Sequence, residues 1–160
     1  MSCAILFYFC QKEKALKTSL FVLFIIMNSA AYCQEWLTDF EVAKKQAAAT
    51  GKNILLVFSG PEWCGNCTKL DTLVWDAPEF KAEAEKSWVL LRADFAQKKG
   101  MPEPVDVNDV KMILTEKYNR DGFFPFIVLL DKTGRKLGKT GYENFETVAE
   151  YIKLFKALGR

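Results

Sequence analysis

The chain has 160 residues, half of them hydrophobic, and a formal net charge of +2. That length is enough for one domain with a substantial hydrophobic core and argues against two. Positive and negative charges are nearly balanced, and no basic block with interleaved aromatic residues occurs, so we expect no nucleic-acid partner. The sequence contains no histidine, which excludes Ser-His-Asp and Cys-His catalysis.

The N-terminal segment has the order of features found in a secretory signal peptide. Lysines precede the apolar run 20–27, and a short stretch of small and weakly polar residues, 28–33, follows it. A transmembrane anchor is the competing interpretation, but a span needs about 20 apolar residues, and this run ends at Asn28. We therefore predict a signal peptide over 1–33, a mature domain over 34–160, and a periplasmic or secreted location, with membrane anchoring as the less favoured alternative.

The distribution of cysteines is consistent with export. Cleavage after Cys33 would remove three of the five cysteines and leave Cys64 and Cys67. A lone cysteine pair can be oxidised outside the cytoplasm, where disulfides persist. Tyr32 precedes Cys33, whereas a lipoprotein signal places a small residue there, so we do not expect lipidation.

The mature chain is expected to begin with a helix and a buried strand. The segment Thr38-Asp39-Phe40-Glu41 has the form of a capping box and predicts a helix that starts at Thr38. Gly51, just after an alanine run, is a natural stop for that helix. The continuous apolar run 54–58 then predicts a buried strand over 53–59.

A second helix is expected directly after Cys64. Cys67, Leu70 and Val74 recur on one helical face. The segment Asp76-Ala77-Pro78-Glu79 has another helix-start pattern, with Asp76 as the cap and a proline in the first turn. We therefore predict that the helix breaks near Trp75 and restarts.

The second half of the chain supplies the remaining elements. Apolar patterns predict strands over 88–95 and 123–130, a hairpin partner near 136–141, and helices over 108–118 and 145–158. A loop is expected between the strand at 88–95 and the helix that follows it.

Two details of these elements bear on the fold. In the helix over 108–118, we expect Val110, Ile113 and Leu114 to face inward. Pro125 has no N–H for a ladder, so it belongs at the first residues of its strand or on a sheet edge. The alternation of strands and helices, followed by a hairpin and a closing helix, predicts an α/β fold with a mixed sheet covered by helices on both faces.

The candidate chemistry lies in Cys64-Gly65-Asn66-Cys67, at the predicted strand-to-helix junction. Thiol-disulfide exchange needs one thiolate that attacks a disulfide and a second thiol that resolves the mixed disulfide. A cysteine at a helix N-terminus lies beside unpaired N–H groups that favour its thiolate. We therefore expect Cys64 to be the nucleophile and Cys67 the resolving thiol.

The cysteine pair could also bind zinc, attach haem or form a purely structural disulfide. A structural zinc site needs four ligands, usually Cys or His, and the sequence has no histidine and no second cysteine pair; we expect neither a metal nor an organic cofactor. Covalent haem attachment needs histidine after the second cysteine, where this chain has Thr68. A purely structural disulfide stays open as the alternative, although a bridge across four residues constrains the unfolded chain only modestly.

At these residues the sequence resembles the thioredoxin superfamily, and in detail the exported, single-domain thioredoxin-like proteins. The resemblance rests on the apolar strand 54–59, the segment Glu62-Trp63-Cys64-Gly65-Asn66-Cys67, and the downstream Phe124-Pro125-Phe126. It covers the chain from about Trp36 to the C-terminus and implies the thioredoxin fold, a central mixed sheet flanked by helices on both faces.

The resemblance also implies a substrate-binding shelf. The proline that matches Pro125 is cis in that superfamily, and the backbone of the residue before it, here Phe124, pairs with the substrate chain. Trp63, which precedes the cysteine pair, and the intervening Gly65 and Asn66 are expected to contact the substrate as well. The competing use of Trp63 and Phe124 is as core aromatics.

Two departures from the superfamily pattern matter. The strand before the motif lacks the buried acid that helps to deprotonate the resolving cysteine in thioredoxins proper, so water or Glu62 would take that role. The dipeptide Gly65-Asn66 lacks the histidine of oxidising relatives and favours a reductant or an enzyme of intermediate potential.

These features predict an exported thiol-disulfide oxidoreductase that acts as a monomer on protein disulfide or dithiol substrates. A reductant outside the cytoplasm would also need an electron donor in the membrane. The alternative is a non-catalytic binding or chaperone-like module that keeps the fold, with a structural disulfide and an apolar surface around Trp63 and Phe124.

Overall fold

The structure is a computed structural model that describes residues 35–95 and 109–160. The predicted signal segment 1–33 and the predicted loop between residues 95 and 109 lie outside the described residues. Of the helices that are described, none is long and apolar enough to cross a membrane.

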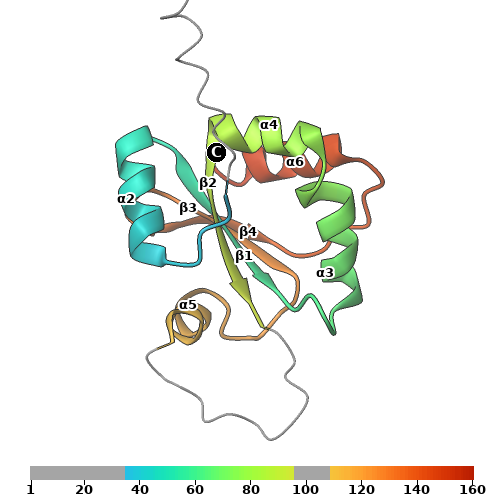
Figure 1. The fold of residues 1–160 in the computed structure, drawn as a ribbon, viewed down its shortest axis with the longest axis horizontal. Helices are drawn as coiled ribbons and strands as arrows, with labels where there is room; N and C mark the ends of the chain where they lie inside the picture. The colour runs from blue at the N-terminus through green and yellow to red at the C-terminus, as the bar shows by residue number, and fades with distance from the viewer. Residues whose placement is uncertain (1–34, 96–108) are drawn as a thin grey trace, which may run out of the picture. The chain divides into compact units, whose positions relative to one another are not determined.

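The described chain alternates strands and helices as the sequence predicts (Figure 1). In chain order the elements are α2 (Phe40–Thr50), β1 (Asn53–Ser59), α3 (Gly65–Leu70), the π-helix η1 (Asp71–Trp75), α4 (Pro78–Ser87), β2 (Trp88–Asp94), α5 (Val110–Tyr118), β3 (Phe126–Leu130), β4 (Lys136–Thr140) and α6 (Val148–Ala157).

The strands form one mixed sheet in the order β2-β1-β3-β4. β1 runs parallel to β2 and antiparallel to β3, and β3 and β4 form an antiparallel hairpin. A single parallel bridge between Leu37 and Leu91 adds to the β2 side. The prediction of a mixed sheet is therefore confirmed.

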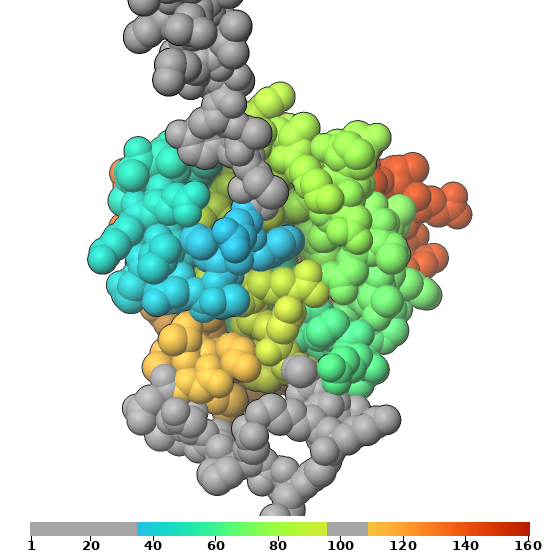
Figure 2. All heavy atoms as spheres, viewed as in Figure 1, coloured from blue at the N-terminus to red at the C-terminus, as the bar shows by residue number. Residues whose placement is uncertain are grey.

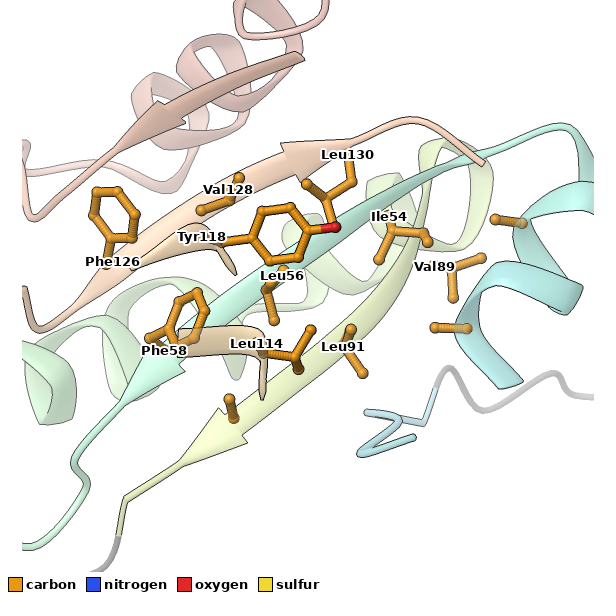
Figure 3. Close-up of a cluster of buried hydrophobic side chains, with 13 residues drawn as sticks. Ile54, Leu56, Phe58, Val89, Leu91, Leu114, Tyr118, Phe126, Val128 and Leu130 are labelled. Atoms are coloured by element: carbon orange, nitrogen blue, oxygen red, sulfur yellow. The ribbon is translucent and has the colours of Figure 1, made fainter. Parts of the chain in front are cut away.

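Both faces of the sheet are buried, which explains the continuous apolar run in β1. Successive side chains point to opposite faces of a strand. On one face Ile54, Leu56 and Phe58 pack with Leu114 and Tyr118 of α5, and α2 adds its buried alanines. Figure 3 shows the labelled side chains of this cluster pointing toward one another.

The opposite face of the sheet is covered by α3, η1, α4 and α6. Leu55 and Val57 of β1 point into this second cluster. Aromatic rings form its centre, with Phe155 in ring contact with Trp75, Phe80 and Trp88. α3 lies on this same face and contributes Leu70 to the cluster.

Two helix starts differ from the prediction by one residue. The N-cap of α2 is Asp39, not Thr38, because the Asp39 carboxylate accepts the N–H groups of Glu41 and Val42. The N-cap of α4 is Ala77, not Asp76, and no side chain caps that helix. Steric contact with a proline ring keeps the preceding residue extended, and Ala77 has φ −67° and ψ 133°.

The inward face of α5 also differs from the prediction. Leu114 is buried as expected, but Val110 and Ile113 are 38% and 52% exposed. α5 packs through Leu114 and Tyr118, one helical turn apart, so its buried stripe is narrow. The strand predicted from residue 123 begins at Phe126, which leaves Pro125 immediately before the ladder.

Candidate active site

The cysteine pair lies where β1 ends and α3 begins. After Ser59 the chain turns tightly, since the carbonyl oxygen of Gly60 accepts the N–H groups of Trp63 and Cys64 at 3.2 and 2.8 Å. Cys64 is the N-cap of α3, and its backbone is extended there. The predicted strand-to-helix junction is therefore the location of the pair.

Cys64 and Cys67 form a disulfide, with their Cα atoms 5.2 Å apart. The N–H of Cys67 donates to Cys64 Sγ at 3.2 Å. Cys64 keeps 8% of its surface exposed, whereas Cys67 keeps 1%. Cys64 is therefore the more accessible residue of the pair.

The peptide bond between Phe124 and Pro125 is cis. Pro125 is buried and Phe124 is half-buried. The indole of Trp63 packs edge-on against the Phe124 ring, with ring centroids 5.0 Å apart. The structure thus joins the residue before Cys64 to the residue before Pro125, which are far apart in the sequence.

Trp63 is partly exposed and held in place. Its indole Nε1 donates to the carbonyl oxygen of Phe95 at 2.6 Å, and the Phe95 ring packs on Phe124. The indole nevertheless keeps 46% of its surface exposed, so Trp63 is not a core aromatic. Gly65 and Asn66 are exposed at the start of α3.

A charged group lies beside the start of η1, on the second face of the sheet. Arg92 of β2 forms ion pairs with Asp71, at the start of η1, and with Asp94, at 2.8 and 2.6 Å. Its Nη2 also donates to the buried Ser59 hydroxyl at 3.3 Å. Burial opposes the charge of Arg92, but the hydrogen bonds with Asp71 and Asp94 outweigh it and raise the arginine's pKa.

Several residues around the pair could not be recognised from the sequence. Gly60, Arg92 of β2 and Phe95 just after β2 belong to no motif of the sequence. The available signal was the pair of charges at alternate positions, Arg92 and Asp94, in an otherwise apolar strand. Glu62, the suggested proton acceptor, lies exposed in the turn.

Across the described ranges, no group of three or more His, Cys, Asp or Glu side chains could hold a metal ion.

Comparison with known proteins gives the family. The family model described as Thioredoxin-like matches residues 35–132, more than half of the chain. The chain belongs to the thioredoxin-like family. Among curated relatives, the disulfide bond reductase DsbH of Chlamydia pneumoniae is 32% identical over 129 residues, which are 81% of this chain and 75% of that protein.

Solved structures agree with this membership. The structure of a DsbH oxidoreductase is 27% identical and superposes with a TM-score of 0.67 over 78% of this chain and 83% of the other. A thioredoxin from Thermus thermophilus, 20% identical, shares the fold with a TM-score of 0.56 over 78% of this chain and 87% of the other.

This thioredoxin-like protein is a thiol-disulfide oxidoreductase. The conclusion follows from its family, from the DsbH relatives and from the disulfide between Cys64 and Cys67. A non-catalytic module with a structural disulfide, the alternative from the sequence, is not favoured.

Proposed function

We propose that this protein reduces disulfides of other proteins outside the cytoplasm, with Cys64 as the attacking thiolate and Cys67 as the resolving thiol. The observation that carries the proposal is the difference in access between the two sulfur-bearing residues, 8% exposed for Cys64 and 1% for Cys67. The Chlamydia pneumoniae relative is a disulfide bond reductase by name, which supports this direction of electron flow.

The reaction starts from the reduced pair. The Cys64 thiolate attacks one sulfur of the substrate disulfide, forms a mixed disulfide and releases the other substrate sulfur as a thiolate, which takes up a proton. The Cys67 thiolate then attacks Cys64 Sγ, restores the Cys64–Cys67 disulfide and releases the second substrate sulfur. Two electrons pass from the protein dithiol to the substrate disulfide.

Two features of the helix start support Cys64 as the nucleophile. The Cys67 N–H, 3.2 Å from Cys64 Sγ in the oxidised form, is positioned to donate to a thiolate there. Cys64 also caps α3, so the unpaired N–H groups of the first turn favour negative charge at its sulfur. Cys67 must lose its thiol proton before it attacks, and water or the exposed Glu62 accepts that proton.

The substrate chain lies across a shelf of five residues. Its backbone pairs with Phe124 before the cis bond to Pro125, and its side chains contact Trp63, Gly65 and Asn66. The exposure of Trp63, Gly65 and Asn66 and the contact between Trp63 and Phe124 support this arrangement.

Export follows from the predicted signal peptide over 1–33, which leaves the domain 34–160 in the periplasm or an equivalent space. There the oxidised protein needs to be reduced again, and a membrane electron donor is the expected source. The domain acts as a monomer and needs no metal or organic cofactor.

Single cysteine variants of the full-length protein test the roles of the pair. Cys64→Ser should abolish reduction of a protein disulfide such as that of insulin, while Cys67→Ser should accumulate a mixed disulfide on Cys64 that mass spectrometry detects after proteolysis. Full activity of Cys64→Ser, or a mixed disulfide on Cys67 instead, would sink the assignment.

The direction of the reaction is tested by the equilibrium reduction potential of the pair against glutathione. A reductase should give a value near that of thioredoxin, about −270 mV. A value near about −120 mV, typical of strong disulfide-forming oxidants, would contradict the reductase direction and leave the exchange chemistry intact.

A further inference from the structure

Phe123 is an exposed aromatic residue next to the cis peptide bond. Its side chain is 59% exposed, more than any other large apolar side chain described as exposed in 35–95 and 109–160. It follows Gly122 and directly precedes Phe124 and Pro125. Phe123 is therefore next in the chain to the proposed substrate shelf.

The backbone of Phe123 is held by a buried amide. Asn119 is only 2% exposed. Its Nδ2 donates to the Phe123 carbonyl oxygen at 2.9 Å, and the Phe123 N–H donates to Asn119 Oδ1 at 3.0 Å. The Gly122 N–H donates to the Asn119 carbonyl oxygen at 3.0 Å, and Gly122 has a φ of 68°, which an L side chain would strain. The turn 119–123 is therefore fixed by hydrogen bonds at both ends.

Phe123 has the properties of a preorganised contact residue, because its backbone is held in one conformation before a partner binds. An aromatic ring on a fixed backbone loses little conformational freedom when a partner covers it, so more of the contact energy appears as affinity. Aromatic residues with this property often dominate the energy of an interface. A solvent-facing Phe on a mobile loop would offer no such advantage.

Phe123 is linked to the aromatic residues around the cysteine pair through the chain, because it is directly followed by Phe124. It contacts Phe126, with centroids 6.2 Å apart, while its chain neighbour Phe124 contacts Trp63 beside Cys64. Figure 2 shows that α5, which leads into this turn, lies at the same end of the described domain as the start of α3. A polypeptide bound at Cys64 and along Phe124 would therefore reach Phe123 within a few residues.

We propose that Phe123 is a specificity-determining residue that binds an apolar side chain close in sequence to the reacting cysteine of the substrate. Asn119 is its positioning residue and acts through the Phe123 backbone. The substrate class is therefore polypeptide disulfides with an apolar residue near the cysteine. This inference rests on the proposed function, since it requires that Cys64 forms the mixed disulfide.

The test is a competition between peptides on the full-length Cys67→Ser variant, which retains the mixed disulfide. Each peptide is a serine-rich nonapeptide with a central cysteine joined to glutathione by a disulfide, and a single leucine is placed at successive positions on either side of the cysteine. Attack by the Cys64 thiolate on the peptide sulfur releases glutathione thiolate and leaves the peptide on Cys64. Mass spectrometry after proteolysis measures the ratio of leucine to serine peptide on Cys64.

We expect a leucine at one or two positions to be preferred about fivefold to tenfold over serine. Phe123→Ser, added to the Cys67→Ser background, should bring that ratio close to one, and Phe123→Leu should restore part of it. Asn119→Ala should lower the ratio as well, because the Phe123 backbone is no longer held. Val42→Ser is the matched control, because Val42 is also an exposed apolar residue, with 46% of its surface exposed. It lies on α2, which contains none of the residues Trp63, Phe95, Phe123, Phe124 and Phe126. It should leave the ratio unchanged.

The outcomes separate this inference from the proposed function. If no leucine position is preferred, or if the preference survives in Phe123→Ser, the inference is wrong, while adduct formation on Cys64 still supports the exchange mechanism. If neither peptide nor glutathione ever attaches to Cys64, the proposed function fails first. The reduction potential of the Phe123→Ser variant with both cysteines present should equal that of the wild type, which excludes an indirect effect through the disulfide.

Discussion

The indole ring of Trp63 lies directly against the backbone of Gly60. A Cβ atom added to Gly60 would come within 2.4 Å of Cε2 and Cζ2 of that ring. The same ring is fixed on its other sides by the Phe95 carbonyl oxygen and the Phe124 ring. Gly60 therefore provides the space that lets Trp63 lie beside the cysteine pair.

Substitution of Gly60 should displace Trp63. We expect Gly60→Ala to lower the free energy of unfolding by about 1–3 kcal/mol, as overpacked sites do, and to change the tryptophan fluorescence of the folded protein. Urea unfolding and emission spectra measure the two effects. Gly65→Ala is the control for stability, because a Cβ at Gly65 meets nothing within 4 Å. Equal stability of the two variants would contradict a fixed Trp63.

Arg92 joins η1, the segment that continues α3, to the sheet, and its loss should destabilise the domain. Arg92→Met leaves Asp71 and Asp94 without their counter-charge, and because the group is only partly buried we expect a loss of about 1–3 kcal/mol in urea unfolding. Adding Asp71→Asn to Arg92→Met should recover part of that loss, since one unpaired carboxylate is removed. Simple additivity of the two single losses would show that the ion pair between Asp71 and Arg92 is not the cause.

The first turn of α2 distinguishes two possible caps. Because the Asp39 carboxylate accepts two N–H groups of the helix, Asp39→Ala should lower the free energy of unfolding by about 1 kcal/mol. Thr38→Ala should change it by less than about 0.5 kcal/mol. Chemical denaturation of both variants provides the comparison, and a larger effect at Thr38 would favour the capping box expected from the sequence.

The turn between β3 and β4 should make stability depend on acid pH. Hydrogen bonds from the Thr133 side chain and from the backbone and side chain of Arg135 hold the pKa of Asp131 well below its ordinary value of 3.8. A lowered pKa in the folded state stabilises the protein above the unfolded-state pKa, and that stabilisation is lost as the pH falls below it. We therefore expect the thermal unfolding midpoint of the wild type to fall more steeply below about pH 4 than that of Asp131→Asn. Parallel curves for the two proteins would refute the role of this carboxylate.

Much of the fold could be predicted because its signals are local. The strand over 53–59, the stop at Gly51 and the break after Trp75 follow from apolar runs, a glycine and a proline within a few residues of each boundary. The two misplaced caps have equally local causes, since an aspartate next to a threonine and an alanine before a proline shift a helix start by one residue.

The face of α5 could not be predicted in the same way. Val110, Met112, Ile113 and Leu114 are all apolar, so periodicity alone allows more than one inward stripe. Packing against the sheet selected Leu114 and Tyr118, and it left Val110 and Ile113 exposed.

The sequence by itself determined the order and type of the elements, the α/β class and the cysteine pair at a strand-to-helix junction, because these depend on residues close together in the chain. Only the tertiary structure decided which distant side chains meet: Trp63 with Phe95 and Phe124, and Arg92 with Asp71. Such contacts depend on strand register and on how helices pack across the sheet, and residues this far apart in the chain carry no local pattern that specifies them.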